Sequence, residues 1–365
     1  MRPSVTVRNA VVAAAALAIA VIPGLANAAT TWSVAHPPYT AVDNVPYAPL
    51  NAISAISATN AWAVGQDSGT PQINHWNGSK WSQSALPSGP CSVFEADCAL
   101  TGVSGDSASD VITIGEGTIP TSAGWVTEAL AYRWNGTAWS QLTVPSSVTY
   151  NEMEHVQAFS PTDAWAVGVG SSTSGAAAAT ALNWNGSTWT QVTTPVSTTN
   201  NLSINAISGS SASDIWVVGE TVTPGYHNRQ FTSVIMHYNG SSWTQLTAPD
   251  NSGLMDVDAV SATDAWAIAA DGSVLSWNGS AWTVATKLAQ GNTAIAALSA
   301  TDVWVAGVVS LTHYNGTSWT STPDPAGVNA LTGHAVLSPG DIWFAGYYYP
   351  SNAVTAPAVL STTAG

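Results

Sequence analysis

Short runs of alternating apolar and polar residues, separated by turns, fill most of the chain. The clearest example covers residues 254–283, where a Ser-Ala-Thr-Asp turn, an Asp-Gly turn and an Asn-Gly turn separate four runs. Asp-Gly and Asn-Gly between β-prone runs are strong hairpin signals, because both central residues must accept a positive φ. The pattern predicts an antiparallel meander of four strands: Leu254–Val260, Ala265–Ala270, Val274–Trp277 and a last one beginning at Trp282.

This unit recurs along the chain in two registers. The first turn, as in Ser261–Trp266, occurs seven times, and aromatic-Asn-Gly-x-x-Trp, as in Trp277–Trp282, occurs six times. The last copy lacks a fourth strand, whereas Thr31–Val34 near the N-terminus resembles one. An N-terminal strand that completes the last repeat closes a ring and hides its sheet edges. The predicted fold is therefore all-β, a single seven-bladed β-propeller over residues 29–365, with residues 29–38 supplying the outer strand of the last blade.

The repeats also carry a family resemblance. AWAVG stands at Ala61–Gly65 and at Ala164–Gly168, each followed by an aromatic-Asn-Gly-x-x-Trp segment. These units resemble those of secreted bacterial propellers of the Asp-box (BNR-like) and photosystem-assembly-factor type, over nearly all of the mature chain. The resemblance implies the propeller fold. It leaves the function open, because such propellers serve as lectins, glycosidases, assembly factors and adhesive scaffolds.

The first 28 residues are typical of a secretory signal peptide. Arg2 and Arg8 precede an apolar run, Ala10–Ile22, and Ala26-Asn27-Ala28 is a small-x-small cleavage site. The thirteen residues of that run are fewer than the ~20 that span a bilayer. The mature protein is therefore expected to be secreted and extracellular, and not membrane-spanning.

The net charge limits the classes of possible partner, and the two cysteines predict a disulfide. Without Arg2 and Arg8 the chain keeps 4 of its 6 basic residues against 21 acidic ones, a formal charge of −17. This balance argues against nucleic acid and anionic membranes. Cys91 and Cys98 are the only cysteines, and in an exported chain a disulfide is favoured over free thiols or a metal pair. No cofactor and no metal are expected, and the expected state is a monomer.

Strand order assigns the loops to two faces. With strands A to D counted outward from the central channel, the A–B and C–D turns are nearly uniform and share one face, here called the uniform face. The B–C and D–A connections vary and share the opposite face, here called the variable face. Variable loops on a rigid scaffold commonly carry function. Binding is therefore expected on the variable face.

Tryptophan is abundant, with 18 residues, of which 17 lie in repeat register. Large rings at one position of every blade indicate packing between blades. The alternative is a lectin with one sugar site per blade. Trp125 alone is out of register, in a long B–C connection over Glu116–Glu128, and is the stacking candidate.

The acidic residues and histidines follow the same register. The aspartates of the A–B turns are expected to accept local backbone N–H bonds; they are Asp110, Asp163, Asp214, Asp264, Asp302 and Asp341. The other acids are assigned to the variable face or its edge, which repels polyanionic polysaccharides but not neutral glycans, cations or basic partners. Surface positions on the uniform face are expected for His75, His237 and His313, and variable connections for His36, His155, His227 and His334.

Stretches from blades 2, 3 and 4 are expected to converge in an asymmetric cleft on the variable face. The predicted ligand-binding residues are Trp125, Glu128, Tyr150, Glu152, Glu154, His155, Tyr226, His227 and Arg229. The favoured function is a non-catalytic binding or scaffold propeller for neutral glycans or cell-surface protein partners, with no catalytic residue assigned.

Two alternatives remain open. A glycoside hydrolase would need two carboxylates about 5–5.5 or 6.5–9.5 Å apart, and a lyase would need a base and a neutralising cation. The residues for such an enzyme are Glu128, Glu152, Glu154, His155 and Tyr226. Three of these, Glu152, Glu154 and His155, are also the set for a divalent metal. The second alternative is a purely structural surface or assembly protein.

Overall fold

The computed structural model describes residues 31–39, 47–92, 96–122, 124–145, 151–171, 176–223, 229–308, 310–338, 340–351 and 354–362, without the side chains of Asn151, Glu152 and Ser171. The chain divides into residues 1–30 and residues 31–365. The predicted signal peptide, residues 1–28, lies outside the described residues. In the part that is described, no helix is long and apolar enough to cross a membrane.

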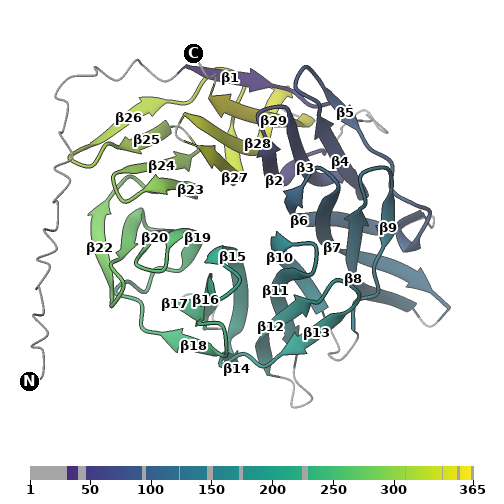
Figure 1. Cartoon of the computed structure of the whole chain (residues 1–365), viewed down its shortest axis with the longest axis horizontal. Helices are drawn as coiled ribbons and strands as arrows, with labels where there is room; N and C mark the ends of the chain where they lie inside the picture. The colour runs from purple at the N-terminus through teal and green to yellow at the C-terminus, as the bar shows by residue number, and fades with distance from the viewer. Residues whose placement is uncertain are drawn as a thin grey trace, which may run out of the picture. The chain divides into compact units, whose positions relative to one another are not determined.

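The described residues form seven antiparallel sheets around a central channel (Figure 1). Blade 1 consists of β2 (Leu50–Ser57), β3 (Asn60–Asp67), β4 (Thr70–Trp76) and β5 (Trp81–Gln83). After a short 3-10 helix, η1 (Pro90–Ser92), blade 2 consists of β6 (Asp97–Ser107), β7 (Asp110–Thr121), β8 (Gly124–Trp134) and β9 (Trp139–Gln141). Blade 3 consists of β10 (Asn151–Ser160), β11 (Asp163–Ser171), β12 (Ala177–Trp184) and β13 (Trp189–Val192), with β14 (Ser197–Thr198) also paired to β12.

The remaining blades repeat this order. Blade 4 consists of β15 (Asn201–Ser211), β16 (Asp214–Val222), β17 (Phe231–Tyr238) and β18 (Trp243–Leu246). Blade 5 consists of β19 (Leu254–Ser261), β20 (Asp264–Ala269), β21 (Ser273–Trp277) and β22 (Trp282–Lys287). Blade 6 consists of β23 (Asn292–Ser299), β24 (Asp302–Gly307), β25 (Ser310–Tyr314) and β26 (Trp319–Pro323). Blade 7 consists of β27 (Ala330–Ser338), β28 (Asp341–Ser351), β29 (Val354–Thr362) and β1 (Trp32–Ala35).

The last blade is closed by the N-terminal strand. Strand β1 pairs antiparallel with β29, in the register Trp32 to Thr362, and the sheet order is β1-β29-β28-β27 (Figure 1). The Trp32 ring lies edge-on to Trp304 of blade 6, with ring centroids 5.2 Å apart. The predicted seven-bladed ring and its closure are confirmed.

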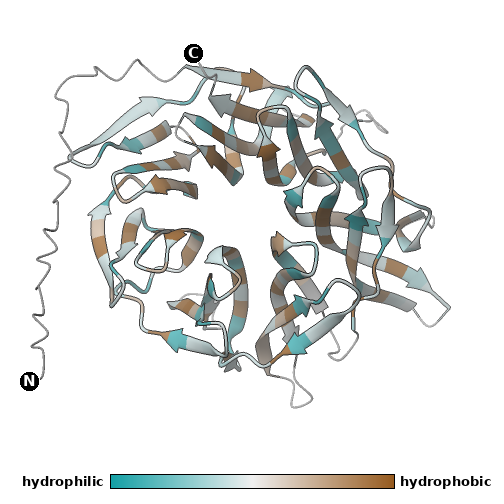
Figure 2. Ribbon diagram, viewed as in Figure 1, coloured by the Kyte–Doolittle hydropathy of each residue, from teal (hydrophilic) through white to brown (hydrophobic). Residues whose placement is uncertain are grey.

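The core lies between neighbouring blades, and Figure 2 shows hydrophobic stretches recurring along the strands. A tryptophan on strand B of one blade meets a tryptophan on strand D of the next. Trp62 and Trp139 are 5.2 Å apart between ring centroids, and Trp216 and Trp282 are 5.1 Å apart, both nearly perpendicular. Edge-to-face pairs of buried rings add to the free energy of burial. The in-register tryptophans therefore pack between blades, as predicted.

The uniform face differs from its prediction in two respects. His237 is half-buried and not a freely exposed surface residue, because its ring stacks on Trp216 at 4.1 Å and its Nε2 lies 2.7 Å from Oδ1 of Asp214. His313 is placed in the same way, 2.8 Å from Asp302, and His75 lies 2.9 Å from Asn60. In these three blades the turn residue therefore binds a strand C side chain rather than a local backbone N–H, because the end of strand C is paired beside the start of strand B. In blade 7 the turn residue Asp341 instead accepts the indole N–H of Trp343 on strand B.

Candidate functional site

Trp125 lies on a hairpin that projects beyond the rest of blade 2. Strands β7 and β8 remain paired as far as Thr121 and Gly124, with Trp125 opposite Pro120. The prediction of a loop over residues 116–128 was wrong, because this stretch continues both strands, and Gly124 with φ 119° allows the tight turn. The Trp125 side chain is 58% exposed. The other tryptophans, all of which the structure describes, are buried or half-buried.

The convergence predicted for blades 2, 3 and 4 remains a prediction. Tyr150, Tyr226 and His227 lie outside the described residues, as does the side chain of Glu152. Glu128 is exposed on β8, opposite Gly117, and Arg229 is exposed just before β17. These placements put both residues on the surface, on different blades.

Glu154 and His155 lie on the innermost strand of blade 3. Glu154 occupies a bulge of β10, between Met153 and His155. His155 lines the central channel, which has a volume of about 350 Å³. His334 lines it from β27. The prediction that both histidines belong to variable connections was wrong, because each lies within the strand that precedes its A–B turn.

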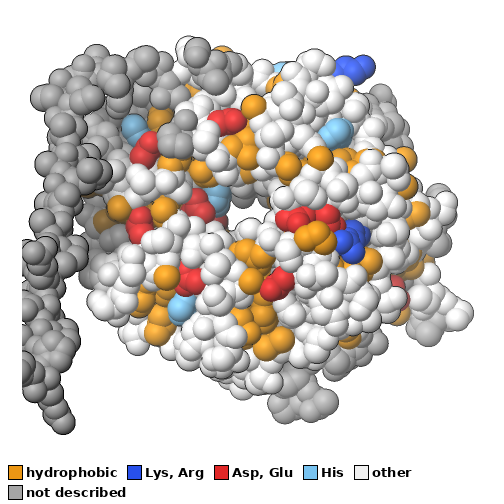
Figure 3. Space-filling view, viewed as in Figure 1, with side chains coloured by type: hydrophobic (Ala, Val, Ile, Leu, Met, Phe, Trp, Pro, Cys, Tyr) orange, Lys and Arg blue, Asp and Glu red, His pale blue; other side chains and the backbone are white. Residues whose placement is uncertain are grey.

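The channel also contains two carboxylates that pair with His334. Nδ1 of His334 lies 2.9 Å from Oδ2 of Asp256, and Nε2 lies 3.6 Å from Oδ2 of Asp258. Burial lowers the pKa of His334, but the charges of Asp256 and Asp258 outweigh burial, so that the pKa is raised well above its usual value. His334 is therefore an imidazolium between two carboxylates. Figure 3 shows acidic and histidine side chains gathered beside the central opening.

Backbone donors fix both carboxylates in place. Oδ1 of Asp256 accepts a bond from the Val257 N–H at 2.9 Å, and its Oδ2 accepts one from the Ile295 N–H at 2.8 Å. Oδ2 of Asp258 accepts the Ala297 N–H at 2.7 Å. Because Ile295 and Ala297 belong to blade 6, the two aspartates connect blade 5 to blade 6 as well as to His334 of blade 7.

His155 has the opposite protonation state. Burial lowers its pKa to about 4, although the charge of Asp256 and a hydrogen bond to the Ile204 backbone oppose that shift. Its imidazole is therefore neutral near pH 7. Among the described residues, no group of three or more His, Cys, Asp or Glu side chains is arranged to hold a metal ion. Among its described lining residues, the channel therefore carries the imidazolium of His334 beside Asp256 and Asp258, together with the neutral imidazole of His155.

The repeat register contained a signal for this cluster. At the strand A position that His334 occupies in blade 7, other blades have an aliphatic residue, such as Ile53, Val103 and Ile295. At the next position of strand A, the hydroxyl of Ser54 in blade 1 accepts a hydrogen bond from the N–H of Gly105 in blade 2 at 3.0 Å. In blade 5 this position is occupied by Asp258. Departures from the repeat within strand A therefore mark the channel residues, and the analysis of turns and loops alone did not find them.

A second aromatic surface lies on the variable face, at the junction of blades 7 and 1. Tyr349 is 51% exposed near the end of β28, and Tyr47 is 52% exposed where the chain enters blade 1. The rings of Tyr347 and Tyr349 are 5.4 Å apart. The backbone of Tyr47 is held by Ser68, whose N–H lies 2.8 Å from the Tyr47 carbonyl oxygen. We call Tyr47, Tyr347 and Tyr349 the tyrosine patch; the sequence analysis did not single it out.

No protein-family model and no curated protein sequence matches the chain. Among solved structures, Ycf48 bound to a D1 peptide is similar with a TM-score of 0.61 at 15% identity, over 92% of this chain and 97% of that one. Ycf48 from Cyanidioschyzon merolae has a TM-score of 0.59 at 16% identity, over 91% and 98%. The WD40 propeller domain of Doa1 has a TM-score of 0.59 at 12% identity, over 92% and 98%. At such identities the likeness shows the fold alone: the chain is a seven-bladed β-propeller that resembles Ycf48 and the WD40 propellers.

Proposed function

We propose that the chain is an exported, non-catalytic binding propeller that recognises neutral glycans or cell-surface partners through its variable face. The observation that carries this proposal is the exposure of Trp125, 58% against a background of buried and half-buried tryptophans. A large exposed ring on a paired hairpin offers a rigid stacking surface. With 58% of its side chain exposed, Trp125 contributes less to packing among the described residues than the in-register tryptophans do.

The tyrosine patch supports the same proposal. Tyr347 and Tyr349 lie on β28 of blade 7 and Tyr47 lies just before blade 1, whereas Trp125 lies on the β7–β8 hairpin of blade 2. The two aromatic surfaces are therefore on either side of blade 1 on the variable face. Residues 345–351 and 354–358, which surround Tyr347 and Tyr349, contain no charged side chain. Uncharged aromatic rings with hydroxyl groups suit a neutral polyhydroxylated ligand, while the net negative charge of the chain disfavours polyanions.

A protein partner is the second candidate. Ycf48, one of the similar structures, is bound to a D1 peptide. Exposed tyrosine and tryptophan are enriched in the centres of protein interfaces. The formal charge of −17 after removal of Arg2 and Arg8 favours a basic segment as that partner.

A glycan array together with a peptide array separates the two candidates. Retention on neutral polysaccharides that falls on Trp125→Ala supports the glycan proposal, and retention on basic peptides alone overturns it in favour of a protein partner. Reducing-sugar release from the same polysaccharides tests the enzyme alternative. Sustained release that depends on Glu128 or Glu154 would contradict a non-catalytic role.

A further inference from the structure

A pocket of about 450 Å³ opens on the variable face where blade 1 meets blade 2. One side is formed by β4 and the turn before it, with Gln72 and Ile73. The other is the connection from β5 to β6, with Leu86, Gly89 and Cys91, and Tyr132 of β8 completes the wall. Its volume falls in the usual range of small-ligand sites, about 300–1,000 Å³. It lies between the Trp125 hairpin and the tyrosine patch.

The lining combines apolar surface with uncharged polar groups. Ile73, Leu86 and Pro87 supply hydrocarbon, whereas Gln83 and the Tyr132 hydroxyl supply hydrogen-bonding atoms. Asp67 is the one charged residue among the described lining residues, and it is only 4% exposed. A ligand with one apolar face and several neutral hydroxyl groups fits such a surface.

Gln72 has an acceptor that is not satisfied. The residue is 3% exposed, and its Nε2 donates to the carbonyl oxygen of Pro38 at 2.8 Å. Its Oε1 is buried and has no hydrogen-bond partner among the described residues. A buried acceptor without a donor costs about 1–3 kcal/mol. Because this oxygen has almost no accessible surface, a ligand in the pocket contacts the rest of the Gln72 side chain and not the oxygen.

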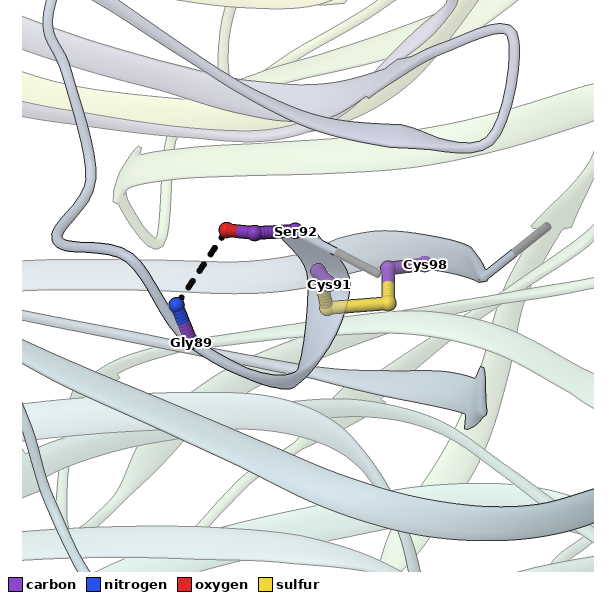
Figure 4. Close-up of a disulfide and its surroundings, with 4 residues drawn as sticks. All are labelled: Gly89, Cys91, Ser92 and Cys98. Carbon is purple, nitrogen blue, oxygen red and sulfur yellow. Dashed lines mark hydrogen bonds between the residues drawn. A yellow bond between two sulfur atoms is a disulfide. The ribbon is translucent and has the colours of Figure 1, made fainter. Parts of the chain in front are cut away.

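The disulfide makes one wall of the pocket rigid. Cys91 and Cys98 are bonded, which confirms the predicted pairing. Cys91 lies in η1, inside the turn in which the Gly89 N–H donates to Ser92 Oγ at 3.2 Å (Figure 4). Gly89, Cys91 and Ser92 all line the pocket. A wall tied covalently to strand β6 is pre-organised, which lowers the entropy that a weak ligand must overcome.

From this geometry we infer that the pocket between blades 1 and 2 binds a single sugar residue at the end of a neutral glycan. The apolar face of the sugar ring packs against Leu86 and Pro87, and its hydroxyl groups bond the Gln83 amide and the Tyr132 hydroxyl. This inference rests on the proposed function, since it presupposes a glycan that also contacts the exposed Trp125. Trp125 then contacts the chain of the glycan, and the pocket selects its terminal residue.

The test uses the mature, oxidised protein and a panel of neutral sugars: glucose, galactose, mannose, xylose, N-acetylglucosamine and their β-methyl glycosides. Binding is followed by titration calorimetry and by saturation-transfer NMR. Gly89→Leu fills the pocket, because a Cβ at this position lies 3.2 Å from the flexible end of Gln141 and 3.8 Å from the Tyr132 hydroxyl. Ser88→Leu is the matched control, since Ser88 is exposed and is not part of the lining.

We expect at least one sugar of the panel to bind the wild type. Gly89→Leu should lower the affinity for that sugar about tenfold or more, whereas Ser88→Leu should change the affinity less than about twofold. Should Gly89→Leu fail to fold, Gln83→Ala at the exposed end of β5 is expected to weaken binding about threefold or more. Equal affinities in wild type and pocket variants overturn the inference and leave the proposed function intact. If no sugar of the panel binds the wild type, the inference falls, while the polysaccharide array with Trp125→Ala still decides the proposed function separately.

Discussion

In the central channel, His334 of blade 7 binds Asp256 of blade 5 past the innermost strand of blade 6, with 2.9 Å between Nδ1 and Oδ2. Blade 6 leaves room for this bond, because Ala294 and Ala296 stand where blade 5 has Asp256 and Asp258. Both aspartates also accept backbone N–H groups of blade 6. The bond therefore connects three consecutive blades next to the closure of the ring.

Breaking this ion pair from the histidine side should destabilise the fold. His334→Val restores the aliphatic residue of the other blades but removes the counter-ion of Asp256. We expect a loss of roughly 1–3 kcal/mol, below that for a fully buried pair, because Asp256 keeps two backbone donors. The double variant Asp256→Ala/His334→Val should lose less than the sum of the single variants. Additive losses in denaturant melts would show that the two residues do not interact.

Alkaline pH should weaken the same interaction. The folded pKa of His334 is raised, so its stabilising contribution is complete below the unfolded value of about 6.5 and is lost as pH rises through the folded value. We expect the melting temperature of the wild type to fall more steeply than that of His334→Val above about pH 7. Parallel curves would contradict the imidazolium assignment.

Acid should act on His155 instead. Its folded pKa is lowered to about 4, so its contribution is present above the unfolded value of about 6.5 and is lost as pH falls toward the folded value. Burial raises the pKa of Asp324 to about 6, which opposes this trend in part of the same window. The matched comparison is therefore with His155→Ala, which should show a shallower acid-side fall in melting temperature than the wild type.

Ring closure depends on Trp32. Its ring lies 5.2 Å from Trp304 and 5.9 Å from Phe344, between blades 6 and 7. Trp32→Ala should destabilise the protein by about 3 kcal/mol, at the low end for a buried tryptophan because the ring is only half-buried. Deletion of residues 30–38 should cost more. A truncated protein that melts within about a degree or two of the mature form would contradict closure by β1.

The Cys91–Cys98 disulfide should stabilise the junction of blades 1 and 2. The loop it closes is short, with a sequence separation of 7, so its removal should cost about 2–3 kcal/mol at most. Intact-mass measurement with and without reductant tests the bond itself. Denaturant melts of the reduced protein and of Cys91→Ser/Cys98→Ser measure its contribution.

The fold was predictable because the repeat determines it. Trp62 and Trp216 each follow the polar residue of the A–B turn, Asn60 or Asp214, by two positions, and Trp81 and its equivalents follow the asparagine of an Asn-Gly turn by four positions. These two recurring registers give the strand order, the number of blades and the position of the missing strand. The channel cluster was not found, because Asp256, Asp258 and His334 depart from the repeat within a strand, where the analysis assigned no function. The histidine partner of Asp214, His237, was also missed, since it lies 23 residues away, near the end of the next strand.

The candidate site was less predictable for a different reason. Exposure of Trp125 followed from its position outside the repeat, but the paired hairpin beneath it did not. The tyrosine patch combines residues from opposite ends of the chain: Tyr47 is bridged to Thr355 of blade 7, which is possible only because the ring closes. The pocket at blades 1 and 2 depends on a connection whose path the sequence alone does not define.

The central claim is that exposed aromatic residues of the variable face bind the ligand while the in-register tryptophans hold the blades together. The test compares two variants, Trp125→Ala and Trp266→Ala, in their affinity for a neutral polysaccharide and in their melting temperature. In the wild type the Trp266 side chain is only 6% exposed. We predict that Trp125→Ala weakens binding by roughly 1–3 kcal/mol with little change in melting temperature, whereas Trp266→Ala destabilises the fold by about 3–5 kcal/mol. If Trp266→Ala abolished binding in a well-folded protein and Trp125→Ala had no effect, the in-register rings would be the binding sites, one per blade, and the account would be wrong.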